Sequence, residues 1–385
     1  MNKKLMAVAV AGALAAPAMS MAQSTVQVFG DLYVEYSFAK QGTSTAGVDM
    51  ANPDVLQTPG SQIGFRGEEK LGGGMSAWFQ CTSTADFRGV SGDGWCTRNS
   101  AVGMKGSFGN AFIGNWDTPF KRTIAAVGGR DTGIFGTAFL LTGNSTTVTD
   151  GASTGVFKRR QRNSINYDSP VFGGFQVMGS FTSTNSSTAT TASSAGAKPR
   201  VWSLGASYKG GPLEVGAGYE MHDKMYGANV ANATTSGDGT GWHISGAYTL
   251  GSVKFGGTWT EQEGETTNAA ATLSTGTTKV KAYHLGAEWK VAGPHNLHFG
   301  YTQADDVKGT ASMGAVRPTP TALDNTGAKL YQIRYLYDFS KRTVGTIGYV
   351  NLKNDSAANY ELGGVSGQGI GAKASAVAVS LSHKF

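Results

Sequence analysis

The sequence predicts an all-β fold, a 16-stranded antiparallel transmembrane β-barrel that forms one domain over residues 23–385. Three observations lead to this prediction. Apolar and polar residues alternate with a period of two along segments of about ten residues. Short and long connections alternate between these segments. No stretch of the chain reaches the roughly 18 to 20 consecutive apolar residues that a transmembrane helix requires.

The two-residue alternation is clearest in the segment 26–38. One face carries apolar residues, namely Val26, Val28, Leu32, Val34, Tyr36 and Phe38. The other face carries Gln27, Asp31, Tyr33, Glu35 and Ser37. A strand of a soluble β-sandwich alternates in the same way, so one strand does not decide the fold. The pattern recurs along the chain, with aromatic residues near both ends of many apolar faces, as the interfacial girdles of a membrane barrel require.

The connections between the predicted strands fall into two classes. The short ones are Lys209–Pro212, Leu250–Ser252, Ala292–His295 and Phe339–Lys341. The long ones are rich in Ser, Thr, Ala and Gly, and they cover Ser183–Lys198, Asp223–Gly239, Glu261–Thr278, Gln303–Gly327 and Asn354–Gly371. Short periplasmic turns and long external loops fit this pattern. A soluble adhesin or lectin would rarely segregate its loops so regularly, and a barrel of about sixteen strands keeps an aqueous lumen.

The first 22 residues resemble a secretory signal peptide. Lys3 and Lys4 precede an apolar run from Leu5 to Ala16, and the small-residue pattern Ser20-Met21-Ala22 follows. We therefore expect the mature chain to begin at Gln23. Removal of the two lysines lowers the formal net charge from +6 to +4, which is too mild for a nucleic-acid partner, and export argues against that partner as well.

Two cysteines, Cys81 and Cys96, occur in a chain that is predicted to be exported to an oxidising compartment. A disulfide between them is the favoured interpretation, and free thiols are the alternative. Both residues point to the outer face if their strands extend that far. A bridge that closes a loop of this size stabilises the fold by about 3 kcal/mol in the chain-entropy treatment.

The segment from Thr118 to Phe157 is longer than a hairpin needs and shows no sustained strand alternation. It must therefore either project outward as an external loop or fold inward. Its charged residues are chiefly Lys121, Arg122, Arg130, Asp131 and Asp150. Its apolar residues Phe135, Phe139 and Leu140 are available to pack on a wall.

Several segments carry a resemblance to a known family. They are Val28-Phe29-Gly30-Asp31-Leu32-Tyr33, Ser61-Gln62-Ile63-Gly64-Phe65-Arg66-Gly67-Glu68-Glu69, Val102-Gly103-Met104-Lys105-Gly106-Ser107-Phe108-Gly109, Asn163-Ser164-Ile165-Asn166-Tyr167-Asp168-Ser169-Pro170 and the terminal Leu381-Ser382-His383-Lys384-Phe385. By their order and spacing the mature chain resembles the Gram-negative general porins, particularly the beta-proteobacterial branch.

This resemblance implies a homotrimer in the outer-membrane lipid, with the third external loop folded into the lumen as a constriction. Close contact between subunits would use small residues expected on the outer face, such as Gly30, Ala374, Ala376 and Ala378. It implies passive diffusion of small hydrophilic solutes and ions. Phe385 resembles the signal that the outer-membrane assembly machinery reads, and its simpler interpretation is the last outward residue of a closing strand. A Gly-Arg pair that is usual in the family is Gly114-Asn115 here, which removes one arginine that normally lines the pore.

The charges expected on the inner face suggest a mild anion preference. Strand phase places Arg66, Lys105, Arg160 and Arg162 toward the lumen, with Arg334 as a weaker addition. Rings of Arg or Lys in a narrow aqueous neck favour anions. The alternative is that these are ordinary hydrated charges, or that they pair with the acidic residues predicted to line the pore, which are Asp31, Glu35, Glu68 and Asp131.

Other function classes find little support in the sequence. Motifs of zinc proteases, serine hydrolases and phosphate loops are missing, so we expect neither an enzyme nor a cofactor. His295 and His298 lie three residues apart on a predicted strand and cannot share a metal ion. A substrate-specific channel on the same barrel is the main alternative, and it would show a track of aromatic residues along the lumen. The inward aromatic residues, such as Phe29 and Tyr33, are scattered in the sequence.

Overall fold

The computed structural model describes residues 26–89, 94–124, 127, 132–137, 157–183, 200–226, 237–266, 276–309, 324–365 and 367–385. The predicted signal peptide, residues 1–22, lies outside these residues. In the part of the chain that is described, no helix is long and apolar enough to cross a membrane.

The described residues form 18 strands and two short helical segments. The first half of the chain contains β1 (Gln27–Gln41), β2 (Asp54–Gln57), β3 (Gln62–Gly72), β4 (Met75–Thr84), β5 (Ser100–Gly106), β6 (Gly109–Asp117), α2 (Pro119–Arg122), the 3-10 helix η1 (Gly133–Phe135), β7 (Arg160–Asp168), β8 (Phe175–Ser183) and β9 (Arg200–Gly210). The second half contains β10 (Leu213–Tyr226), β11 (Gly237–Leu250), β12 (Val253–Thr266), β13 (Gly276–Ala292), β14 (His295–Ala304), β15 (Lys308–Gly309), β16 (Ala328–Asp338), β17 (Thr343–Asn354) and β18 (Lys373–Lys384).

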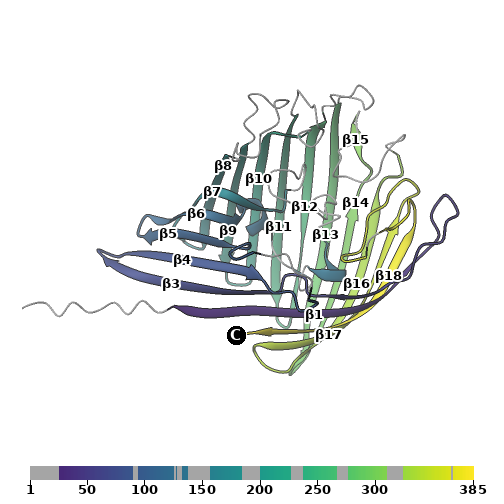
Figure 1. Cartoon of the computed structure of the whole chain (residues 1–385), viewed down its shortest axis with the longest axis horizontal. Helices are drawn as coiled ribbons and strands as arrows, with labels where there is room; N and C mark the ends of the chain where they lie inside the picture. The colour runs from purple at the N-terminus through teal and green to yellow at the C-terminus, as the bar shows by residue number, and fades with distance from the viewer. Residues whose placement is uncertain are drawn as a thin grey trace, which may run out of the picture.

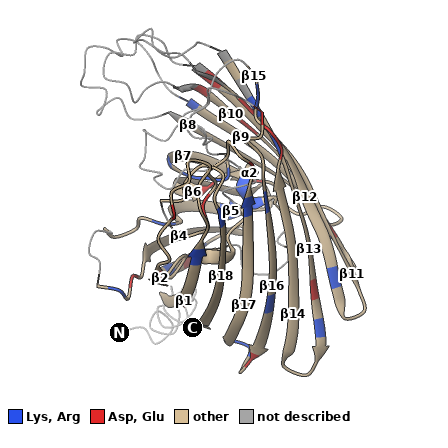
Figure 2. Ribbon diagram, turned by 90° about the vertical axis from the view of Figure 1, so that its right-hand side faces the viewer, with Lys and Arg blue, Asp and Glu red and all other residues tan. Residues whose placement is uncertain are grey.

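The strands close into one antiparallel barrel. Consecutive long strands pair along the chain, and β1 pairs with β18 over eleven residue pairs to complete the ring. The short strands β2 and β15 only extend the pairing beside β1 and β13, so 16 strands make the wall. Figure 1 shows β18 and the C-terminus beside β1, and Figure 2 shows α2 within the ring of strands. The prediction of a 16-stranded antiparallel β-barrel is confirmed.

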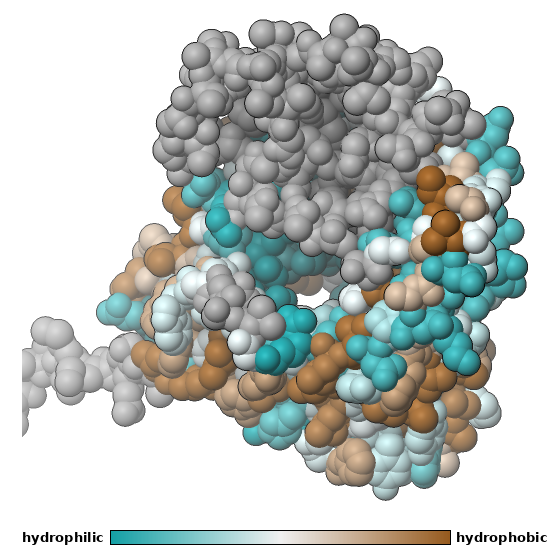
Figure 3. Space-filling view, turned by 45° about the vertical axis from the view of Figure 1, so that its right-hand side comes forward, coloured by the Kyte–Doolittle hydropathy of each residue, from teal (hydrophilic) through white to brown (hydrophobic). Residues whose placement is uncertain are grey.

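The outer wall is apolar and the inner wall is largely polar. Outward side chains such as Val34, Ile333 and Val377 are exposed, whereas inward Ser203 and Thr302 are buried. Hydrophobic residues lie over the outer face of the strands in Figure 3. This is the alternation that a strand shows between lipid and an aqueous lumen.

Two details differ from the sequence-based expectations. The strands β10, β12 and β13 continue into stretches expected to be loops. On β13, Lys279 and Lys281 form ion pairs with Glu261 of β12 in this extended part, which stabilises the pairing of these two strands. Ala374, Ala376 and Ala378, expected on the outer face as candidate subunit contacts, point inward instead and are at most 2% exposed. Their neighbours Val377 and Val379 take the outer face, so β18 offers the lipid side its larger residues.

Candidate functional site

The segment that follows β6 begins with a short helix against the inner wall. The Thr118 hydroxyl accepts a hydrogen bond from the Lys121 amide, and Pro119 occupies the first turn of α2, where a missing N–H costs nothing. The Phe120 amide donates to the Ser203 hydroxyl at 3.0 Å. Ser203 lies on the inner face of β9, opposite in phase to the exposed Trp202 and Leu204. α2 therefore lies inside the barrel.

Strand β11 fixes the end of this helix. The Nε2 atom of His243 lies 3.0 Å from the Thr123 hydroxyl and 2.9 Å from the Phe120 carbonyl oxygen. The Ser245 hydroxyl donates to the Thr123 carbonyl at 2.9 Å. His243 and Ser245 alternate with the exposed Trp242 and Ile244 and therefore lie on the inner face. No local pattern predicts their contact with α2, because the partners lie more than 100 residues apart in the sequence.

The next described part of the segment reaches the opposite wall. The Ile134 amide donates to Glu35 of β1 at 2.9 Å. The same carboxylate accepts 2.6 Å hydrogen bonds from the Tyr33 hydroxyl and the Gln57 side-chain amide, and Glu35 is fully buried. Glu35 lies on the inner face as predicted, but it binds the chain and is not exposed to the lumen water.

An apolar cluster inside the barrel surrounds this contact. Phe135 is 1% exposed, and the guanidinium carbon of Arg334 lies 5.0 Å from the centre of its ring. The cluster also contains inward residues of the wall, namely Ala39, Leu330, Val350, Leu352, Ala374, Ala376 and Ala378. The connection between β17 and β18 contributes Ala358, Tyr360, Leu362 and Val365. Two segments far apart in the sequence therefore pack together within the ring.

Basic residues gather around α2. The Arg122 guanidinium binds both carboxylate oxygens of Asp168 at 2.8 and 2.7 Å. Lys121 and Arg160 both contact Asp117, at 2.8 and 3.3 Å. Burial lowers the pKa of the Lys121 amine, and the nearby Asp117 carboxylate offsets only part of this effect. Arg160 also donates to the Asn99 side chain at 2.6 Å.

A β-bulge interrupts β7 beside these residues. Gly114 pairs with Ser164 but Trp116 pairs with Gln161, and Asn163 has a left-handed φ of 53°. The alternation that placed Arg160 and Arg162 on the inner face does not continue through this bulge. Their lumen-lining role remains a prediction.

Residue Arg159, which the sequence did not single out, is 2% exposed just ahead of the bulge. It lies near His222, whose ring stacks on Phe157 with centroids 4.5 Å apart and contacts Glu220 at 2.7 Å. Glu220 and His222 are on the inner face of β10 and fully buried. This cluster holds the returning end of the segment against the wall.

Three other predicted pore-lining residues lie at the short-turn end. Lys105 and Glu68 form a 2.7 Å ion pair, and their side chains are 45% and 43% exposed. Arg66 donates to Gln27 at 3.1 Å and lies over the Phe29 ring. Gln27 precedes Glu35 by eight residues on β1, about 26 Å along a strand. These charges therefore lie at the barrel mouth, far from η1.

Asp31 and Asp131 are the two remaining acidic residues that were predicted to line the pore. Asp31 lies on the inner face of β1, where it pairs in register with Gln62 and Lys384 near the same mouth. Asp131 lies outside the described residues.

Inward aromatic residues are less scattered than the sequence suggested. Trp78 of β4 and Phe112 and Trp116 of β6 form one cluster on the inner wall, with ring centroids 5.1 to 5.8 Å apart. Gly103 lies between the strands, where a side chain would collide with Trp78 and Phe112. Strand phase places these three side chains on the inner face, but the prediction of their contact also requires the register of β4, β5 and β6.

Two predicted features lie outside the lumen. Cys81 and Cys96 form a disulfide, as expected, and the Ser83 hydroxyl accepts a hydrogen bond from the Cys96 amide at 2.9 Å. Phe385 exchanges two 3.2 Å backbone hydrogen bonds with Gly30, and its ring covers the space where a Gly30 side chain would stand. Phe385 therefore ends the closing strand on the outer face; its role as an assembly signal remains a prediction.

The closed wall, the apolar exterior and the polar interior define a transmembrane β-barrel of the outer-membrane class. A family described as "Gram-negative porin" matches residues 7–357. The chain belongs to this porin family, and its place is the bacterial outer membrane.

Individual relatives agree with the family. Outer membrane porin protein 32 of Delftia acidovorans is 27% identical over 394 residues, which cover 100% of both chains. Major outer membrane protein P.IB of Neisseria gonorrhoeae is 39% identical over 117 residues, but this match spans only 30% of each chain. Among solved structures, the anion-selective porin from Comamonas acidovorans shares the fold with a TM-score of 0.69 at 22% identity, covering 94% of this chain and 100% of that one.

Proposed function

We propose that this protein forms a water-filled channel through which small hydrophilic solutes and ions diffuse passively, with a mild anion preference, and that it is not an enzyme. The observation that carries the proposal is the placement of α2 and η1 against opposite inner walls of the closed barrel. A segment held in this way narrows the lumen but does not close it, which is the arrangement that a diffusion channel needs. We further propose that the segment as a whole is the constriction.

The anion preference rests on the charges around α2. Among the described residues of this cluster, the cations Lys121, Arg122, Lys158, Arg159 and Arg160 outnumber the acids Asp117, Asp168 and Glu220. A net positive charge near a narrow aqueous path raises the local concentration of anions. The name of the Comamonas relative, an anion-selective porin, supports the same direction.

We also propose a homotrimer, delivered by the outer-membrane assembly machinery and surrounded by outer-membrane lipid. The support is the fold shared with an outer membrane protein of Vibrio cholerae that is described in a trimer form, with a TM-score of 0.64 at 15% identity. Cross-linking of the purified protein tests this state directly, and a purely monomeric pattern would contradict it.

Planar-bilayer conductance with a KCl gradient tests the channel. We expect large ohmic steps and a reversal potential of the sign that marks anion selectivity. A cation-selective reversal potential would overturn the anion preference alone. Correctly folded protein without any conductance would overturn the channel itself.

The aromatic cluster of Trp78, Phe112 and Trp116 favours a second candidate, a channel that prefers particular solutes with apolar faces, because such faces stack on aromatic rings. Blockage of the ionic current by aromatic or sugar solutes tests it. Current reduction that a Trp116→Ala variant abolishes would support this candidate, and equal reduction in both proteins would reject it.

A further inference from the structure

Three lysines stand in one row on the outer face of the barrel. Lys329 of β16 pairs in register with Lys353 of β17, and Lys353 pairs with Lys373 of β18. Lys329 shares the outward phase of Ile333, and Lys373 shares that of Val377. All three lysines are exposed, and they lie at the ends of their strands that lead to the long connections.

Such a row is electrostatically unfavourable by itself. Cα atoms of directly opposite residues on antiparallel strands lie about 5 Å apart, and like charges at these positions repel. Asp355 is near Lys329, but burial, and after it the nearby Asp306, raise the pKa of the Asp355 carboxyl more than Lys329 lowers it, which weakens Asp355 as a counter-charge. Within the described part of the chain no ion pair joins the three lysines to an acid.

Strand β13 provides a contrast at the same end of the barrel. Lys279 and Lys281 also point outward, and both form ion pairs with Glu261 of the neighbouring strand. Their charge is therefore compensated within the wall. Among the described residues, the row of Lys329, Lys353 and Lys373 has no such ion pair within the wall, so an anion from outside would relieve its mutual repulsion.

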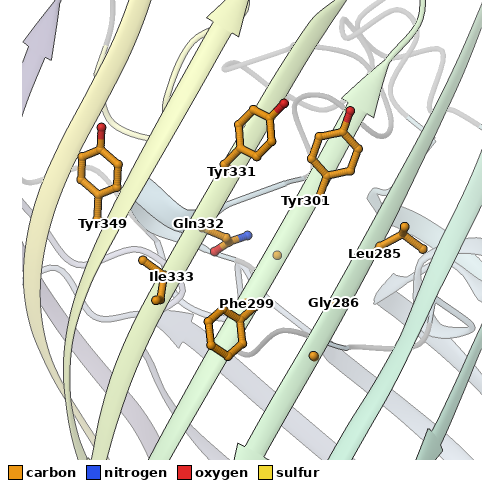
Figure 4. A pocket seen from close by; sticks show the side chains of 10 residues that line it. Leu285, Gly286, Phe299, Tyr301, Tyr331, Gln332, Ile333 and Tyr349 are labelled. Carbon is orange, nitrogen blue, oxygen red and sulfur yellow. The ribbon is translucent and has the colours of Figure 1, made fainter.

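An apolar groove lies beside this row on the outer wall. It has a volume of about 470 Å³, and Ala287, which shares the outward phase of Leu285 and pairs in register with Phe299, has the smallest outward side chain of its lining. Its sides are formed by Leu285, Phe299, Ile333 and Tyr349. In Figure 4 the hydroxyl groups of Tyr301, Tyr331 and Tyr349 lie toward one end of the strands, with Phe299 and Ile333 below them.

The row and the groove meet at Tyr331. The Lys353 ammonium lies 5.4 Å from the centre of the Tyr331 ring, which lines the groove, and Lys329 is two residues from Tyr331 on the same strand. A positive rim thus borders an apolar trough on a surface that contacts outer-membrane lipid. We propose that this surface binds an anionic lipid of the outer leaflet, with phosphate on the lysine row and an acyl chain in the groove.

A binding experiment separates the two parts of the site. The folded protein in non-ionic detergent is titrated with bisphosphorylated lipid A, with its dephosphorylated form and with inorganic phosphate, and bound lipid is counted by native mass spectrometry. For the variant K329Q/K353Q/K373Q we expect roughly a hundredfold weaker binding of the bisphosphorylated lipid, because each lysine near an anionic lipid surface contributes about fivefold. The matched control K279Q/K281Q should bind within about twofold of the native protein.

A second variant tests the groove without touching charge. Ala287→Phe fills the trough, and we expect weaker binding of the acylated lipid with unchanged conductance and circular dichroism. Equal binding by the native protein and the lysine variant would overturn the proposal. So would binding of inorganic phosphate as tight as that of the lipid, or a lysine variant whose subunit association changes while its lipid binding does not.

Discussion

Two inner-face glutamates, Glu35 and Glu68, show how the covered middle of the barrel interior differs from its mouth. Glu35 is fully buried and accepts hydrogen bonds from Tyr33, Gln57 and the Ile134 amide. Glu68 has a side chain that is 43% exposed, and its ion pair with Lys105 stands in open water. Two residues with the same inward strand phase therefore lie in different environments, one buried and one exposed to water.

The difference comes from chain that is distant in sequence. Ile134, which covers Glu35, is 99 residues away from it, whereas nothing beyond the wall covers Glu68 among the described residues. Strand alternation determines whether a side chain lies on the inner or the outer face, and the segments inside the barrel determine whether an inner-face side chain is exposed to water. A buried carboxylate with three donors contributes to structure, whereas an exposed one acts mainly on passing ions.

The largest effect is expected from Glu35→Ala. This substitution leaves the Tyr33 hydroxyl, the Gln57 amide and the Ile134 amide without their acceptor. We expect a loss of about 2 to 4 kcal/mol of stability, because each buried donor without a partner costs about 1 to 3 kcal/mol and water offsets part of the sum. Thermal unfolding followed by circular dichroism measures this loss, and single-channel conductance should rise as η1 leaves the wall.

Glu35→Gln is the matched control, since it keeps the shape and one carbonyl acceptor. Its effect should be smaller than that of Glu35→Ala. Equal unfolding temperatures for the native protein and Glu35→Ala would show that the wall, and not this carboxylate, holds the segment.

A somewhat smaller effect is expected where the two inward segments touch. A side chain on Gly363 would overlap the Gly133 carbonyl oxygen, so Gly363→Ala must push the segments apart. Overpacking of this kind costs about 1 to 3 kcal/mol. The control is Gly179→Ala on β8, where a new Cβ meets nothing closer than 3.7 Å. An equal fall of the unfolding temperature in Gly363→Ala and Gly179→Ala would contradict the close contact between Gly363 and Gly133.

His243→Phe should cost less, about 1 kcal/mol, because it removes the hydrogen bonds to Thr123 and Phe120 but keeps a ring against Phe120. Unfolding temperature and conductance noise measure the effect on α2. His295→Phe changes an exposed histidine that contacts Tyr335 outside the lumen, and it should leave both readouts unchanged. Matching noise in the two variants would argue against a role for His243 in holding α2.

Much of the wall could be predicted because each strand carries its own pattern. The faces of β1 and the outward direction of Cys81 follow from a period of two, and the disulfide follows from two cysteines in an exported chain. The bulge at Asn163 could not be predicted, because asparagine adopts a left-handed φ more readily than most residues, yet most asparagines do not adopt it. One inserted residue was enough to interrupt the phase of Arg160 and Arg162.

The interior contacts were beyond sequence reasoning for a different reason. They join the segment after β6 to β1, β9, β11 and β16, so they depend on which strands face each other across the ring. No local pattern in Phe120 or Ile134 encodes that placement. The aromatic cluster of Trp78, Phe112 and Trp116 likewise required the register of three strands.

The smallest effect is expected at the mouth. Lys105→Gln breaks the pair with Glu68, and exposed pairs contribute about 0 to 1 kcal/mol, so the unfolding temperature should hardly change. The unpaired Glu68 should instead attract cations and shift the reversal potential slightly toward cation selectivity at low salt, with the shift lost as the Debye length falls to about 3 Å near 1 M. The double variant with Glu68→Gln should restore the native potential. A stability loss comparable to that of Glu35→Ala would remove the contrast between the mouth and the covered interior, because it would mean that the charge pair stabilises the mouth as strongly as the buried carboxylate stabilises the interior.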